Sequence, residues 1–153
     1  MSNIEYISGG RELLDLVKPL WEQSRKYHEG KSNYFAGHFV GLTFDKRKEK
    51  FFKETTELVH IDIAKNSLNG AFIGYCICSV STSRVGEIDS LFLETESRKL
   101  GIGEELMNRA ITWLDDNQVT SKVVVVGEGN ENVLEFYERF GFRTCEIVME
   151  EIR

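Results

Sequence analysis

The chain has 153 residues, of which 41% are hydrophobic and 29% are charged, and its formal net charge is −6. This length suits one domain with a sizeable core, and the composition is globular rather than disordered. The acidic balance argues against non-specific nucleic-acid binding, because neutralising phosphates requires an excess of Lys and Arg.

The sequence shows no sign of a membrane span, a secretion signal or a metal site. No run of 18 apolar residues occurs, and residues 1–5 lack the pattern of a signal peptide. We therefore expect one cytoplasmic domain covering residues 1–153, with neither a nucleic acid nor a membrane as partner. Cys76, Cys78 and Cys145 are expected to be free thiols. No second Cys/His cluster offers zinc ligands, so no metal is expected.

The N-terminal third predicts a strand followed by helical and irregular segments. Residues 3–8 suit a short strand, and apolar residues recur at helical spacing from Leu13 to Leu20. Pro19 interrupts that spacing, so the helix is expected to kink or end near Lys18. Residues 27–44 contain several glycines and aromatics without a clean period. A short helix is predicted over about residues 46–53.

The middle of the chain predicts an antiparallel meander. Residues 58–65 alternate, with Val59, Ile61 and Ile63 on one face and His60 and Asp62 on the other. Asn69-Gly70 is a strong hairpin signal, and strands are expected over residues 71–81 and 87–93.

The C-terminal part changes to alternating helices and strands. An apolar stripe from Ile102 to Leu114 predicts a helix, and residues 123–126 suit a strand buried on both faces. A second stripe over residues 133–140, closed by Gly141, predicts another helix. Residues 142–152 suit a last strand. A right-handed crossover to a parallel neighbour is implied, giving a mixed sheet with helices on both faces.

The segment from Arg98 to Gly103 carries the most informative chemistry. Its glycines stand where a strand gives way to a helix, and they allow the backbone to approach a ligand closely. The unpaired N–H groups of the first helical turn suit a pyrophosphate. A dinucleotide fingerprint would need a third glycine where Leu106 stands, and no P-loop is present. A helix start without a ligand stays open at this point.

Two spaced motifs, taken in order, resemble the GNAT superfamily of N-acetyltransferases. Arg98-x-x-Gly101-x-Gly103 after a strand is similar to the family signature, and residues 130–142 resemble its Asn-x-x-Ala-x-x-x-Tyr-x-x-x-Gly-Phe block, with Val133 in place of Ala. The Gly74-Tyr75 pair also matches. The resemblance implies an α/β (α+β) fold: a mixed sheet of six to seven strands, an antiparallel meander plus one parallel pair, flanked by about four helices.

The resemblance also implies where acetyl-CoA binds. The strand before the signature would splay from its parallel neighbour, and the thioester would enter the gap. The backbone would hold the acetyl and pantetheine groups at Leu91, Phe92 and Leu93. The pyrophosphate would lie on the amides of Arg98, Lys99, Leu100, Gly101, Ile102, Gly103 and Glu104. Asn130 matches the residue that contacts the pantetheine arm, and its other interpretation is an N-cap of the next helix.

Candidate catalytic residues follow from the same comparison. Tyr137 matches the tyrosine near the thioester sulfur, where a phenol supplies a proton or hydrogen bond to the departing thiolate. Glu87 occupies a position where several family members carry a glutamate base, and Asp89 is the second choice. Both carboxylates would share a face if no bulge intervenes, which would raise the pKa of one of them and attract a cationic amine. His28 and His38 are further candidate bases.

The expected activity is direct acetyl transfer from acetyl-CoA to a primary amine in one ternary complex. The acceptor is expected to be a small amine or amino compound, enclosed by the aromatics of residues 27–39. The alternatives are a protein N-terminus or lysine as acceptor, and an acyl-CoA-binding module without turnover. The alternating segment from Arg143 to Arg153 suits either an edge strand or an interface, so a homodimer stays open.

Overall fold

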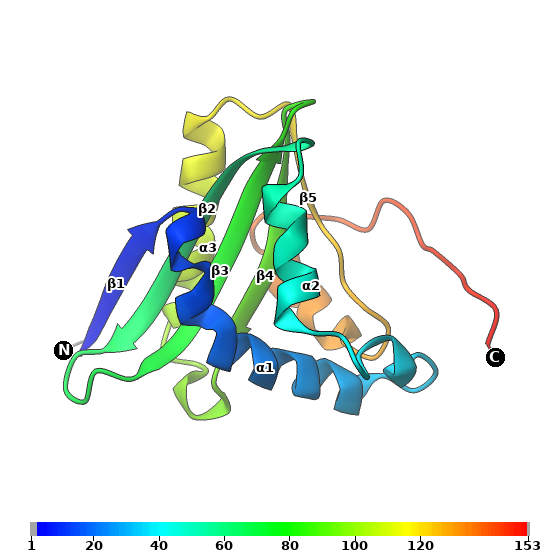
Figure 1. Ribbon diagram of the computed structural model, residues 1–153, viewed down its shortest axis with the longest axis horizontal. Helices are drawn as coiled ribbons and strands as arrows, with labels where there is room; N and C mark the ends of the chain where they lie inside the picture. The colour runs from blue at the N-terminus through cyan, green and yellow to red at the C-terminus, as the bar shows by residue number, and fades with distance from the viewer. Residues whose placement is uncertain (1–2, 153) are drawn as a thin grey trace.

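The computed structural model describes residues 3–152, which form one mixed sheet between two layers of helices (Figure 1). The strands lie in chain order, from β1 to β5. Their bounds are β1 Ile4–Gly9, β2 Thr56–Asn66, β3 Phe72–Ser81, β4 Val85–Leu93 and β5 Ser121–Val124. The first four strands pair antiparallel, and β5 pairs parallel to β4, so the expected meander and parallel pair are both confirmed.

The helices cover both faces of the sheet. One layer contains α1 Leu14–Lys31 and α2 Phe44–Glu49, and the other contains α3 Ile102–Asp116 and α4 Leu134–Glu138. Helix α1 does not end at Pro19, although its ribbon changes direction between its first turns and the remainder (Figure 1). A kink is expected where proline removes one backbone hydrogen bond. No helix within residues 3–152 is both long and apolar enough to cross a bilayer.

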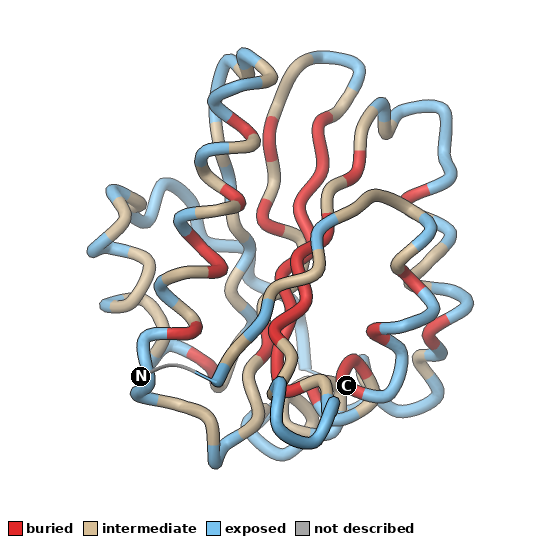
Figure 2. Tube along the Cα trace, turned by 90° about the vertical axis from the view of Figure 1, so that its left-hand side faces the viewer, coloured by how far each residue is buried: buried red, intermediate tan, exposed pale blue. Residues whose placement is uncertain are grey.

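Two hydrophobic clusters hold the layers together. The alternation of β2 sends Val59, Ile61 and Ile63 toward α1 and α2, as expected from the sequence. Across the sheet, Leu106 and Leu114 of α3 belong to the second cluster. The buried residues follow the central strands, where both faces of the sheet are covered (Figure 2).

The prediction that residues 123–126 form a strand buried on both faces is wrong. Strand β5 ends at Val124, and the side chains of Val123 and Val125 are 38% and 80% exposed. A strand is buried on both faces only when it lies in the interior of a sheet. Here β5 is the edge strand of the described residues, with β4 as its one neighbour.

The predicted last strand over residues 142–152 is also wrong. This segment has no regular secondary structure and pairs with no strand, and Ile147, Val148 and Met149 are between 80% and 91% exposed. Figure 1 shows it running away from the helices and the sheet. Alternation favours an extended chain, but a strand also needs a partner for its backbone groups. The described residues therefore contain five strands rather than six or seven, with four α-helices as expected. Arg153 lies outside the described residues.

Candidate active site

A β-bulge in β4 sets the orientation of the residues that line the site. On β3, Ile77 faces Ser90 and Cys78 faces Ile88, so Asp89 is an extra residue in the ladder. Ile88 and Leu91 lie in the cluster under α3. On the other face of the sheet, the Asp89 side chain is hydrogen-bonded to Ser79 and the Ser90 side chain to Tyr75, although Asp89 and Ser90 are consecutive. A bulge produces this change by placing two residues opposite one.

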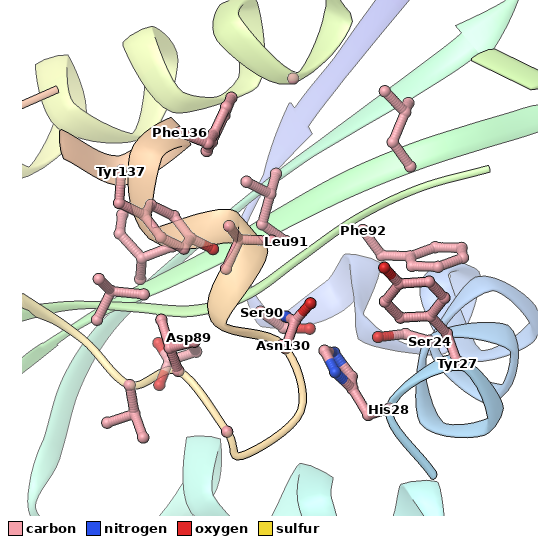
Figure 3. Close-up of a pocket in the computed structure, with 18 of the residues that line it drawn as sticks. Ser24, Tyr27, His28, Asp89, Ser90, Leu91, Phe92, Asn130, Phe136 and Tyr137 are labelled. Carbon is pink, nitrogen blue, oxygen red and sulfur yellow. The ribbon is translucent and has the colours of Figure 1, made fainter. Parts of the chain in front are cut away.

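The parallel pair separates beyond the bulge. Strand β5 pairs with β4 only from Val85 to Ile88, so residues 89–93 have no strand on that side. The separation opens into a cavity of about 800 Å³. Leu91, Phe92 and Leu93 of β4 and residues 124–127 line this cavity, together with residues of α1 and α2. Figure 3 shows Leu91 and Phe92 of β4, and Tyr27 and His28 of α1. The expected splay between the parallel strands is therefore present.

The loop from Arg98 to Glu104 lies at the edge of this cavity. Lys99 and Gly101 have positive φ angles of 68° and 79°, and α3 begins directly after Gly101 without a capping side chain. Ile102 is buried in the core and anchors the turn, whereas Leu100 is 68% exposed. The first-turn N–H groups of a 15-residue helix thus lack a side-chain partner at the positive end of its dipole. Such a terminus suits a phosphate.

The side chains of this loop contribute unequally. Lys99, Gly101, Gly103 and Glu104 line the cavity. Arg98 also lines the cavity, but its guanidinium is bound within the protein: Nε donates to the carbonyl of Leu93 at 3.1 Å, and Cζ lies 4.9 Å from the centroid of the Tyr27 ring. Arg98 therefore connects the end of β4 to α1.

Asn130 is the clearest unsatisfied group in the cavity. It is only 8% exposed, and its Oδ1 atom is buried without a hydrogen-bond partner among the described residues. It precedes the short 3-10 helix Glu131–Val133 but makes no capping hydrogen bond, so the alternative N-cap interpretation is not supported. A buried acceptor without a partner is costly. A ligand N–H in the cavity would satisfy it, so the site fits a ligand that carries amides.

Tyr137 projects from α4 toward β4, with its hydroxyl directed at the cavity near Leu91 (Figure 3). Its ring packs between Phe136 and Phe142, at centroid distances of 5.4 and 6.2 Å. Burial raises the pKa of the phenol well above its ordinary value. The hydroxyl therefore stays protonated at neutral pH and is able to donate.

Glu87 and Asp89 both form ion pairs with the same lysine, Lys50. Lys50 Nζ contacts Glu87 Oε1 at 2.9 Å and also binds Asp89 Oδ1. Glu87 does not line the cavity. Asp89 does, although its side chain has no exposed surface, and its Oδ2 accepts from Ser79 at 2.6 Å. Desolvation raises the pKa of Asp89, although Lys50 opposes this. Lys50 offsets one of their two negative charges, and Asp89 has the raised pKa that we expected for one of the carboxylates; a role of either carboxylate toward a cationic amine stays a prediction.

Of the two histidines considered, one lies in the cavity. His28, in the last turn of α1, lines it beside Asn130 (Figure 3) and stacks on Phe39 at 6.0 Å. Burial lowers the pKa of His28, so its imidazole is neutral at pH 7. His38 is 57% exposed, contacts Glu150 at 3.0 Å and does not line the cavity. Tyr27 and Phe39 line it as well, as expected for part of residues 27–39.

The cysteines do not form a reactive site. Cys76 and Cys78 are free and buried, and desolvation raises the pKa of both thiols far above the usual range. Thiols in this state are poor nucleophiles. Cys145 is free and exposed. Within residues 3–152, no three His, Cys, Asp or Glu side chains lie close enough to hold a metal ion.

Several residues of the cavity were not identified from the sequence. Arg47 and Ser90 line it, and Lys50 holds the two carboxylates beside it. Arg47 and Lys50 belong to a charged run that resembles a solvated helix face, and Ser90 points inward only because of the bulge. No pattern in the sequence distinguishes these three from surface residues.

The mixed sheet, the separation of its parallel strands and the glycine-containing start of α3 are the arrangement that the sequence resemblance implies. The family model described as "Acetyltransferase (GNAT) family" matches residues 18–142. The chain therefore belongs to the GNAT family of acetyltransferases.

Two curated relatives match part of the chain. An uncharacterised N-acetyltransferase of Methanocaldococcus jannaschii is 30% identical over 92 residues, 56% of this chain and 41% of that protein. A mycothiol acetyltransferase of Acidimicrobium ferrooxidans is 30% identical over 78 residues, 48% of this chain and 25% of that protein. The aligned region is thus less than half of either relative.

Solved structures share the fold over the whole chain. A GCN5-related N-acetyltransferase from Ralstonia eutropha superposes with a TM-score of 0.72 at 16% identity, covering 97% of this chain and 98% of that one. An aminoglycoside N-acetyltransferase in complex with CoA gives a TM-score of 0.65 at 14% identity, with 97% and 98% covered. At such low identity these likenesses establish the fold alone.

Proposed function

We propose that this protein binds acetyl-CoA and transfers the acetyl group to the nitrogen of a primary amine, with both substrates bound together. The observation that carries the proposal is the gap between β4 and β5, because Leu91 to Leu93 and Asn130, with its unpaired Oδ1, line the cavity into which the gap opens. A thioester and its amide-bearing arm fit such a gap. The solved aminoglycoside N-acetyltransferase of the same fold binds CoA.

The cofactor is held from three directions in this proposal. The first-turn amides of α3, from Ile102 to Glu104, and the turn at Lys99 to Gly101 hold the diphosphate. Asn130 Oδ1 accepts an amide N–H of the pantetheine arm. The unpaired edge of β4 supplies backbone donors and acceptors near the acetyl group, where a donor stabilises the charge that develops on the carbonyl oxygen.

Tyr137 is proposed as the proton donor to the leaving sulfur. As the amine nitrogen bonds the acetyl carbon, the carbon–sulfur bond breaks and the sulfur carries the electron pair away. The phenol of Tyr137 donates to that sulfur, which requires that it be protonated, and its burial ensures this.

His28 is proposed as the base that takes the proton from the amine, in preference to Glu87 and Asp89. A base must be neutral or anionic, open to the cavity and free to accept. His28 lines the cavity and has a lowered pKa. Both carboxylates are held by Lys50, and we propose that this ionic cluster fixes residues 50–52 against β4 instead.

The cavity favours a small acceptor over a protein. Tyr27, His28, Phe39 and Leu42 narrow its far end, where a peptide would need an open groove. Experiment must distinguish an enzyme from a module that binds acyl-CoA without turnover. Calorimetry with CoA and acetyl-CoA, followed by thiol release with a panel of amines, polyamines, amino acids and peptides, tests both parts. We expect binding of both forms and thiol release with one amine class; absence of binding by folded protein would refute the proposal.

A further inference from the structure

Arg47 is a half-buried cation in the far end of the cavity. Its Nη2 donates to the carbonyl of Asp89 at 2.8 Å, and its guanidinium lies 5.5 Å from the Phe51 ring centroid. Within residues 3–152, no carboxylate lies within ion-pair distance of it. The remaining N–H groups of Arg47 are therefore available to another acceptor.

The neighbouring cations already have carboxylate partners. Arg25, which also lines this end, pairs with Glu22 at 3.5 Å and Glu29 at 3.1 Å. The carboxylate of Asp89 is bound by Lys50 and Ser79. Arg25 and Lys50 thus each have carboxylate partners, whereas Arg47 has none among the described residues. A half-buried, unpaired guanidinium favours an anion, because the partner offsets part of its desolvation cost.

Hydroxyl groups surround the same position. Tyr75 and Ser90 share a hydrogen bond of 2.8 Å, and Ser24 lies within reach of the Tyr75 hydroxyl. The charge of Arg47 is near enough to lower the pKa of Tyr75, against the larger opposing effect of burial. Ser24 and Ser90 line the cavity. When Tyr75 donates to Ser90, the Ser90 proton is free to point inward.

This set of groups is suited to a carboxylate. A planar guanidinium offers parallel N–H groups that match two carboxylate oxygens, and a hydroxyl adds a further donor. Tyr27, Phe39 and Leu42 form an apolar surround that suits an uncharged side chain. A polycation such as an aminoglycoside, the acceptor class named for one structural neighbour, would instead place positive charge against Arg47.

We propose that the acceptor is an amine that also carries a carboxylate, as an amino acid does, and that Arg47 binds the carboxylate. The inference rests on the proposed function, because it concerns the second substrate of the same cavity. In this arrangement the carboxylate is fixed at α2, and the amine is directed back toward His28 and the gap between β4 and β5.

Matched acceptors test the inference directly. Alanine, leucine and phenylalanine are each compared with their amides and with the corresponding decarboxylated amines, at saturating acetyl-CoA. The three members of a set have the same amine and side chain and differ in the carboxylate. We expect kcat/KM to be highest for the amino acid in at least one set. The inference is overturned if the amide or amine is the better substrate in every set, or if only polyamines or aminoglycosides react.

Variants of α2 identify the group responsible. Arg47→Gln should raise KM for the preferred amino acid roughly 10- to 100-fold, the loss expected for a charged hydrogen bond. It should change KM for the decarboxylated amine little, and Arg47→Lys should recover part of the loss. Lys46→Gln removes the same charge from an exposed neighbouring position and should have no effect. Equal losses for the acid and the decarboxylated amine would assign Arg47 a structural role and refute the inference.

The affinity for acetyl-CoA distinguishes a failure of the inference about Arg47 from a failure of the proposed function. If acetyl-CoA binds tightly and no carboxylated amine is acetylated, the inference about Arg47 fails and cofactor binding stands. If acetyl-CoA does not bind to the folded protein, the proposed function itself fails.

Discussion

The Oγ of Ser32 donates to Glu128 Oε1 at 2.6 Å, although 96 residues separate them in the chain. The same carboxylate accepts the backbone N–H groups of Asn33 at 2.8 Å and Tyr34 at 3.1 Å. Ser32 caps the end of α1, and Glu128 follows the residues that line the cavity beyond β5. One carboxylate therefore joins the α1 side of the cavity to the β5 side.

Glu128→Gln should loosen this connection, because the amide places an NH₂ group among N–H donors. We expect faster amide hydrogen exchange over residues 32–39 and a higher KM for the acceptor, with acetyl-CoA affinity little changed. The donors lower the pKa of Glu128 to about 2, so the connection persists from neutral to mildly acidic pH and is lost only as pH falls through that value. Glu135→Gln, at an exposed site, is the control; unchanged exchange over residues 32–39 would contradict this role.

Gly129, next to Glu128, lies close to the backbone of Lys31 at the end of α1. Its φ is +91°, and a Cβ there would collide with the carbonyl of Lys31. Gly129→Ala should lower the free energy of unfolding by more than about 1 kcal/mol, because both the backbone conformation and the contact exclude a side chain. Gly30→Ala, near the end of α1 with no atom within 4 Å of the added carbon, should be neutral or stabilising. Denaturant unfolding compares the two; equal midpoints would refute the assignment.

The sequence predicts the antiparallel strands and the turn before α3 well, because local patterns determine them. The alternation around Ile61, the Asn69-Gly70 turn and the stripe that begins at Ile102 each specify an element without reference to distant residues. A glycine-containing turn does precede α3, as the sequence predicts, with positive φ angles at Lys99 and Gly101. These features depend on spacing alone.

The part of the cavity near Asp89 and Ser90 could not be predicted, because long-range contacts determine it. The bulge at Asp89 arises from the pairing of β3 with β4, and it brings Asp89 and Ser90 to one face. The ion pair between Lys50 and Glu87 depends on how the segment after α2 packs against β4. The pattern of residues 142–152 likewise predicts an extended chain but supplies no partner strand for it.

Asn130→Ala tests the proposed contact with the pantetheine arm. Because Oδ1 is buried without a partner, its removal should leave the unfolding free energy nearly unchanged or slightly higher. Affinity for acetyl-CoA should fall roughly tenfold, as expected for one lost hydrogen bond in a dry site. Calorimetry and thermal unfolding on the same preparation distinguish the roles. A large loss of stability with unchanged affinity would show that Asn130 supports the fold instead.

Tyr137→Phe tests the proton donor. The phenyl ring keeps its contacts with Phe136 and Phe142, so the fold and acetyl-CoA affinity should be preserved. Turnover should fall roughly 100-fold or more, the usual effect of losing an acid catalyst. With the raised pKa, wild-type activity should show no loss from Tyr137 ionisation up to about pH 10. Turnover equal to wild type would remove Tyr137 from the mechanism.

His28→Gln tests the base through the pH dependence of kcat/KM. A base acts when deprotonated, and burial lowers the pKa of His28 below its ordinary 6.5. Wild-type kcat/KM should therefore rise with pH through a value below 6.5 and level off by neutral pH. The variant should lose that rise and roughly 100-fold of activity at pH 7.

The lowered pKa of His28 also makes the stability of the fold depend on pH. The unfolded chain binds a proton at His28 more readily than the folded one, so this contribution is present above pH 6.5 and declines as the pH falls below it. His38→Gln, at an exposed position, should change neither profile. Glu87→Gln is the decisive comparison, because its carboxylate is held by Lys50 outside the cavity. If Glu87→Gln abolishes the rise in kcat/KM and His28→Gln does not, the base is the glutamate and the histidine serves only as a wall of the cavity.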